Sequence, residues 1–149
     1  MSGTRKGAGV GWSSLRQGAK VLVDSAPIIY LLEDNARFAP RFLPLFEAEA
    51  ARHISIAIST ITLAEVLCGP YFKGQDALAQ RYAKTLGAFE VVPVATEIAT
   101  SAARLRARYR LKLPDAIQLA TALEIGADAL VTHDRDFGAV EGLLVLDGS

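Results

Sequence analysis

The chain has 149 residues, of which 51% are hydrophobic, and a single cysteine, Cys68. This length and composition predict one domain with a large core, and a lone cysteine excludes an intramolecular disulfide and a cysteine-rich zinc site. The 16 basic and 16 acidic residues cancel, whereas nucleic-acid-binding proteins are usually basic overall. The apolar runs fall well short of the roughly 20 residues that cross a bilayer, and no secretory signal is evident, so we expect a cytoplasmic protein without membrane association.

Residues 1–20 differ in composition from the rest of the chain. They hold four basic residues and no acid, are rich in Gly and Ser, and show no apolar periodicity. We therefore expect a flexible N-terminal extension, or a remnant of expression, followed by a folded domain at residues 21–149.

Short apolar strands alternate with helical segments from residue 21 onward. We predict strands at residues 21–24, 53–59, 90–94, 129–131 and 143–146. We predict helices at residues 27–34, 40–52, 60–67, 75–86, 96–110 and 114–125, the third of them ending before Gly69-Pro70 and the last before Gly126. Such alternation favours right-handed crossovers and a parallel sheet with both faces covered.

The segment at residues 96–110 fits two periods. Its basic residues alternate with apolar ones, as in a strand. Ile98, Ala102, Leu105 and Tyr109 nevertheless have helical spacing, and Ala and Arg are good helix formers. We interpret this segment as a helix.

Acidic residues fall where open α/β sheets place their functional sites. Asp24 and Asp134 follow predicted strands, and Asp136 is a further candidate in the same loop. Glu65 and Asp115 lie in early turns of predicted helices, Asp115 directly after Pro114. Like charges that share a crevice are usually offset by a hard cation or a shared proton, and oxygen ligands favour Mg²⁺ or Mn²⁺ over zinc. Such ions can activate a water for phosphodiester cleavage, so the pattern predicts a nuclease.

Each acid also has an ordinary structural interpretation. Asp24 can cap the following helix, and Glu65 can return a hydrogen bond in a capping box with Thr62. Asp115 can complement a helix dipole, and the acids after residue 133 can be solvated turn residues. Only convergence on one edge of the sheet favours a shared role as ligands.

Four blocks occur in a fixed order: VDSAPIIYLLE at residues 23–33, STITLAEVLCGP at 59–70, LPDAIQLATA at 113–122 and LVTHDRDF at 130–137. Together they resemble the PIN-domain family, and within it the VapC-type ribonuclease toxins of toxin-antitoxin pairs. The resemblance implies a three-layer α/β/α domain with a central parallel sheet of about five strands. It further implies Mg²⁺-dependent cleavage of RNA by a metal-activated water, frequent homodimers and a small cognate antitoxin protein as partner.

The resemblance also implies roles for individual residues. The catalytic and metal-binding acids would be Asp24, Glu65, Asp115 and Asp134, with Asp136 competing for the fourth position. Asp24 and Asp115 would hold the principal Mg²⁺, for which Mn²⁺ would substitute. We favour Asp134 as the fourth acid because it lies nearer the strand end. Ser25 and Thr132 would be the polar neighbours of the acids.

Basic residues are concentrated at Arg104, Arg106, Arg108, Arg110 and Lys112, with no acid between them. Most of these side chains are expected to form a solvated helix face that complements the negative helix end. Arg104, Arg108 and Lys112 are our candidates for contacts with RNA phosphates.

Two alternatives belong to other classes of protein. A catalytically inactive PIN-like module would bind RNA or a protein and would tolerate loss of the acids. A phosphatase of the haloacid dehalogenase type would need a nucleophilic Asp-x-Asp after the first strand. Because Ser25 and Ala26 follow Asp24, we rank the phosphatase third.

Overall fold

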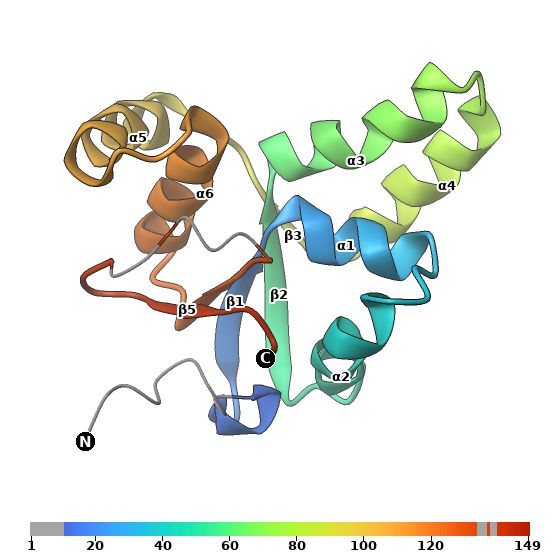
Figure 1. The fold of residues 1–149 in the computed structure, drawn as a ribbon, viewed down its shortest axis with the longest axis horizontal. Helices are drawn as coiled ribbons and strands as arrows, with labels where there is room; N and C mark the ends of the chain where they lie inside the picture. Colours follow the sequence, from blue (N-terminus) through green and yellow to red (C-terminus); the bar gives the residue numbers. More distant parts are fainter. Residues whose placement is uncertain (1–10, 134–136, 138–139) are drawn as a thin grey trace.

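The central element is a five-stranded parallel sheet, seen in a computed structural model that describes residues 11–133, 137 and 140–149 (Figure 1). The strand order is β3-β2-β1-β4-β5, and every neighbouring pair is parallel. The strands are β1 (Ala19–Val23), β2 (Ile54–Ser59), β3 (Glu90–Val92), β4 (Ala129–Val131) and β5 (Leu144–Leu146). The predicted α/β class and the parallel sheet of five strands are confirmed.

Helices cover both faces of the sheet (Figure 1). One face carries α1 (Ser25–Leu32), α2 (Ala39–Ala50), α3 (Thr60–Phe72) and α4 (Asp76–Leu86), and the other carries α5 (Thr96–Tyr109) and α6 (Leu113–Glu124). Alternate β1 side chains divide between the two cores: Val21 and Val23 pack with α1–α4, and Leu22 packs with α5 and α6. Both faces are therefore apolar, as a parallel sheet between two helical layers requires.

Helix boundaries agree with the sequence prediction to within two residues, except at the end of α3. This helix runs through Gly69 and Pro70 to Phe72, instead of ending before them. Pro70 lies in the last turn and lacks the N–H of one helical hydrogen bond, and it is buried. The segment at residues 96–110 is helical, as interpreted, and ends where Arg110 adopts a left-handed φ of 57°.

Part of the predicted N-terminal extension is packed against the domain. Residues 12–14 form a 3-10 helix, Leu15 is buried, and β1 begins two residues earlier than predicted. The Trp12 indole donates to the Arg41 carbonyl oxygen at 3.1 Å, and Arg16 pairs with Asp128. Trp12 and Leu15 give this polar segment the apolar surface it needs to pack, which its average composition conceals. Residues 1–10 lie outside the described part of the chain.

Across the residues that the structure describes, no helix is both long enough and apolar enough to cross a bilayer.

Candidate active site at the carboxyl edge of the sheet

The carboxyl ends of β1 and β4 lie side by side. Val23 pairs with Val131, and the Asp24 N–H donates to the Val131 carbonyl oxygen at 2.8 Å. Asp24 and Thr132, which follow these strands, therefore emerge at the same edge, where open α/β sheets place their sites.

Asp24 has a buried carboxylate, only 8% exposed, with both oxygens hydrogen-bonded. Oδ1 accepts from the Ser25 backbone N–H at 2.8 Å and from the Gln118 amide at 3.0 Å. Oδ2 accepts from the Thr132 hydroxyl at 2.8 Å. Asp24 is also the N-cap of α1, so the capping interpretation is correct, but the cap uses only one of three donors.

Asp115 is brought to the same edge by α6. It lies in the first turn of this helix after Pro114 and is 9% exposed. Gln118, three residues later, falls on the same side of the helix, since residues three apart are neighbours on a helix surface. Because Gln118 touches Asp24, the start of α6 places Asp115 close to the end of β1.

Glu65 is exposed on α3. The cap of this helix is Ser59, whose hydroxyl accepts from the Thr62 N–H at 3.2 Å, so the capping box suggested for Thr62 and Glu65 is wrong. Within the described residues, no three His, Cys, Asp or Glu side chains lie close enough together to hold a metal ion. The structure thus brings Asp24 and Asp115 to one edge without grouping Glu65 with them, and a ligand role for Glu65 stays a prediction.

The fourth acidic position lies beyond the described residues, because Asp134 and Asp136 are both outside them. His133, just before them, is anchored on α1 and α2. Its Nδ1 lies 2.7 Å from the Tyr30 hydroxyl, and its ring meets the edge of Phe38 at a centroid distance of 4.6 Å. The chain is therefore fixed from β4 as far as His133.

Gln118, Ser59 and Thr62 are site residues that the sequence alone did not reveal. Gln118 is 1% exposed, and it contacts Ser59 and Thr62 as well as Asp24. A signal was present: a glutamine one turn after Asp115, in a helix whose neighbouring positions Leu119 and Ala120 are apolar and buried. A polar side chain on the buried side of a helix requires partners there.

The donor chemistry fits a hard cation. Asp24 and Asp115 offer only oxygen, and Mg²⁺ commonly binds proteins through one or two carboxylates and completes its shell with water and substrate phosphate. In the part of the chain that the structure describes, the three groups that donate to Asp24 are neutral, so no side-chain cation offsets its charge. The edge is therefore suited to Mg²⁺ or Mn²⁺.

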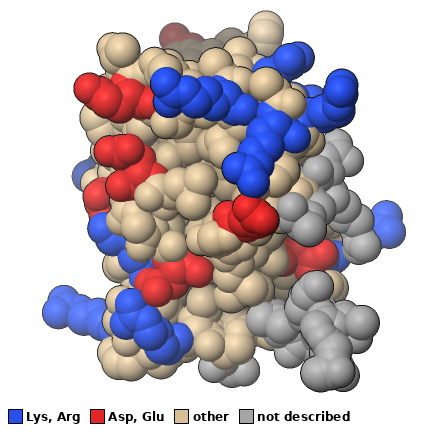
Figure 2. Space-filling view, turned by 90° about the vertical axis from the view of Figure 1, so that its left-hand side faces the viewer, with Lys and Arg blue, Asp and Glu red and all other residues tan. Residues whose placement is uncertain are grey.

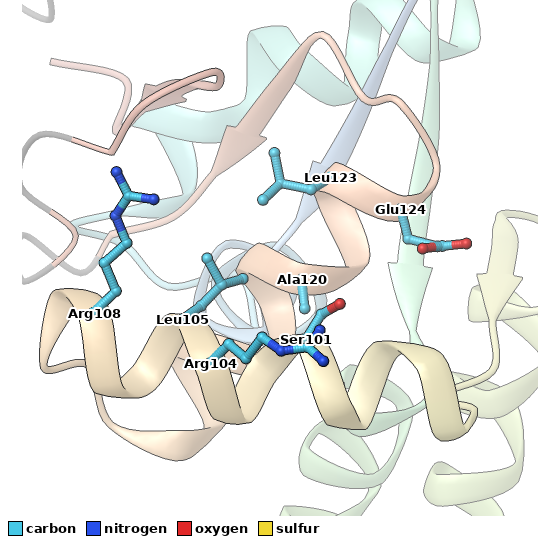
Figure 3. A pocket seen from close by; sticks show the side chains of 7 residues that line it. All are labelled: Ser101, Arg104, Leu105, Arg108, Ala120, Leu123 and Glu124. Atoms are coloured by element: carbon cyan, nitrogen blue, oxygen red, sulfur yellow. The ribbon is translucent and has the colours of Figure 1, made fainter.

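Basic side chains gather along the upper part of the face that carries α5 and α6, whereas acidic ones are scattered over it (Figure 2). Between the two helices lies a groove of about 370 Å³ that includes Arg104 and Arg108 of α5 and Glu124 of α6 (Figure 3). Arg108 pairs with Glu141 at 2.8 Å. Lys112 is the N-cap of α6, three residues before Asp115, so the basic stretch ends beside the candidate site.

The fold and this edge define a class of protein. The family model of the PIN domain matches residues 21–143, and the chain belongs to the PIN domain family. A toxin-antitoxin complex from Klebsiella pneumoniae contains a chain that is 33% identical, with a TM-score of 0.68 and coverage of 87% of this chain and 98% of that one. No curated protein sequence matches the chain.

More distant structures share the fold. Mycobacterium tuberculosis VapC20, a toxin that cleaves the sarcin-ricin loop, is 19% identical, with a TM-score of 0.66 over 81% of this chain and 97% of that one. FitAcB from Neisseria gonorrhoeae is 18% identical, with a TM-score of 0.68 over 86% and 97% of the two chains. The predicted family is thus confirmed, and its VapC-type members are structural neighbours.

Proposed function

We propose that the chain is a Mg²⁺-dependent endoribonuclease and the toxin of a VapBC-type toxin-antitoxin pair. One observation carries the proposal: a buried Asp24 carboxylate, held by three neutral donors, lies at the carboxyl edge of the sheet beside the helix that bears Asp115. This arrangement holds the carboxylate at a fixed place without a side-chain cation among its donors, which suits a ligand of a divalent cation.

Asp24 and Asp115 would hold the principal Mg²⁺, and Mn²⁺ would substitute for it. Glu65 and Asp134, or Asp136 in its place, would be further direct or water-mediated ligands. A bound Mg²⁺ would lower the pKa of a coordinated water and offset charge that develops on the scissile phosphate. Thr132 and the Ser25 N–H orient the Asp24 carboxylate through the bonds described above.

RNA would be held in part by the basic stretch. Arg104, Arg108 and Lys112 are exposed, and Lys112 leads directly into the helix that carries Asp115. Contacts from such side chains to phosphates give affinity that depends on salt and ignores sequence.

The protein partners would be a small antitoxin and a second copy of the chain. The Klebsiella pneumoniae relative is a toxin-antitoxin complex. The end of α3 leaves apolar surface exposed around Leu67 and Cys68, including Tyr71 at 51% and Phe72 at 88%. An exposed patch of this kind is typical of a protein that binds a partner.

The test compares the parent with Asp24→Asn and Asp115→Asn. Each protein is induced in a bacterium to measure growth, then purified and incubated with structured RNA in Mg²⁺ or in EDTA. We expect growth arrest and Mg²⁺-dependent cleavage by the parent, and cleavage reduced more than about 100-fold in both variants, beyond the usual effect of residues that only support ligands. Asp128→Asn, at the opposite edge of the sheet, is the matched control and should cleave like the parent.

A different result would favour the binding module. If the parent bound RNA but cleaved none above background, and both variants bound it equally well, the acids would be structural. The inactive PIN-like module would then replace the nuclease as the function of the chain.

A further inference from the structure

Gln118 makes three side-chain hydrogen bonds at the candidate site. It lies in the second turn of α6 and is 1% exposed. Its amide nitrogen donates to Asp24 Oδ1 at 3.0 Å and to Thr62 Oγ1 at 2.6 Å, and its amide oxygen accepts from the Ser59 hydroxyl at 2.9 Å. These bonds join α6 to the ends of β1 and β2 and to the first turn of α3.

The orientation of the Gln118 amide is determined by its partners. An ionised carboxylate only accepts hydrogen bonds, so the NH₂ group, not the oxygen, must face Asp24. The Ser59 hydroxyl already accepts from the Thr62 N–H at 3.2 Å and has its own proton to give to the Gln118 oxygen. Both amide protons and the amide oxygen are thereby used.

The same bonds restrict the Asp24 carboxylate. A carboxylate offers about four acceptor positions, and three are taken by Ser25, Gln118 and Thr132. The acceptor position that remains is on Oδ2, which accepts only from Thr132 among the described residues. Gln118 and the Ser25 N–H both donate to Oδ1. The carboxylate therefore cannot rotate to exchange its two oxygens without breaking these two hydrogen bonds.

We propose that Gln118 is the positioning residue for Asp24: its neutral amide fixes Oδ1 so that Oδ2 is presented to a divalent cation with the carboxylate charge intact. A lysine or arginine could also donate to the carboxylate but would offset its charge and could not accept from Ser59. A leucine would fill the space but would leave Oδ1 with one donor fewer. This role rests on the proposed metal-dependent function.

A purely structural role for Gln118 would show itself in stability alone. The chain offers a matched control one turn later on α6. Thr121 is fully buried, and its hydroxyl donates to the Ile117 carbonyl oxygen within the helix at 2.7 Å. Thr121→Val therefore changes a buried polar side chain of the same helix without removing any bond to Asp24.

The experiment titrates Mn²⁺ alone into the purified full-length parent, Gln118→Leu, Thr62→Val and Thr121→Val, with calorimetric detection. Thermal unfolding of each protein gives its stability. We expect Gln118→Leu to weaken Mn²⁺ binding about 10- to 100-fold, the usual effect of losing a group that orients a metal ligand. Thr62→Val, which removes one anchor of the amide but spares its bond to Asp24, should weaken binding by less than about tenfold. Thr121→Val should leave binding unchanged.

The outcomes separate the two proposals. Parent-like Mn²⁺ binding by Gln118→Leu would overturn the positioning role and leave the nuclease proposal standing. An equal loss of affinity in Gln118→Leu and Thr121→Val would also overturn it, because loosening of α6 would then be sufficient. If Gln118→Leu does not fold, the Mn²⁺ affinities of Thr62→Val and Thr121→Val are compared. Weaker binding by Thr62→Val than by Thr121→Val supports the positioning role, and equal binding overturns it. A parent that binds no Mn²⁺ and cleaves no RNA would overturn the proposed function itself.

Discussion

Two aspartates link β1 to β4 at opposite ends of the same strand pair, and their surroundings differ in kind. At the carboxyl edge, Asp24 accepts from Ser25, Gln118 and Thr132. At the amino edge, Asp128 accepts from the Lys20 backbone N–H at 2.8 Å and from the Arg16 guanidinium at 3.1 Å. Both carboxylates fasten strands, but only Asp128 is paired with a side-chain cation.

The surroundings determine what each charge can do. The Lys20 N–H chiefly, with help from Arg16, holds the pKa of Asp128 below its ordinary value, while partial burial opposes this shift. The Arg16 guanidinium lies against Asp128 and partly offsets its charge, although the pair is partly exposed to solvent. The neutral donors around Asp24 orient its carboxylate and preserve its charge, so the same side chain is structural at one edge and suited to a cation at the other.

Among the tests of this contrast, the largest effect is expected from Thr132→Val, which removes one of the three neutral donors to Asp24. Valine has nearly the shape of threonine but removes the donor to Asp24 Oδ2. We expect RNA cleavage and Mn²⁺ affinity to fall about 10- to 100-fold, measured by single-turnover cleavage and calorimetry. Thr132→Ser keeps the hydroxyl and should retain most activity. A larger loss in Thr132→Ser than in Thr132→Val would mean that packing of the methyl group, not the hydrogen bond, supports the site.

The position of Asp24 followed from the sequence, but the restraint on its carboxylate did not. An apolar strand followed by Asp24, and a helix with Pro114 in its first turn, are local patterns, and both elements lie within two residues of their predicted bounds. Gln118 acts through bonds to residues 56, 59 and 94 positions away along the chain. Side-chain pairing over such distances depends on how helices and strands meet, which local periodicity does not record.

The next prediction concerns Asp128 and its partners Arg16 and the Lys20 N–H. Asp128→Asn removes the negative charge that interacts with Arg16 and the Lys20 N–H. Because the ion pair is partly exposed, the free energy of unfolding should fall by only about 1 kcal/mol. Urea denaturation at neutral pH would measure this change. RNA cleavage at 25 °C should stay at the parent rate. A cleavage defect as large as that of Thr132→Val would remove the distinction between the two edges.

The pH dependence of stability tests whether Asp128 acts through its charge. Because the folded-state pKa of Asp128 lies below the ordinary value of 3.8, its contribution is complete above that value and is lost as the pH falls through the folded pKa. The stability difference between the parent and Asp128→Asn should therefore be constant from neutral pH down to about pH 4.5 and shrink below 3.8. Urea denaturation at a series of pH values gives the curve. A difference that persists unchanged at pH 2 would show that Asp128 acts without its charge.

The N-terminal segment shows where composition was a poor guide. Averaged over residues 1–20, the sequence is polar and basic, and it predicts a flexible extension. Two apolar side chains, Trp12 and Leu15, and one ion pair, Arg16 with Asp128, nevertheless pack residues 11–18 against the domain. Arg16 reaches an acid 112 positions away, so its partner cannot be read from neighbouring residues.

The smallest expected effect concerns a paired and an unpaired arginine in the groove between α5 and α6. Arg108 is held by Glu141, whereas Arg104, in the same groove, forms no ion pair with any described residue. Arg104 should therefore be the better phosphate ligand. In an Asp24→Asn background that prevents cleavage, Arg104→Gln should reduce the slope of log Kd against log salt concentration for single-stranded RNA by about 0.7, the contribution of one phosphate contact. Arg108→Gln should reduce it less, since Glu141 already competes for the guanidinium.

Arg81→Gln, on α4 across the sheet, is the control and should leave the slope unchanged. A larger change for Arg108 than for Arg104 would mean that RNA displaces Glu141, and that a charge paired in the free protein is still available to the substrate.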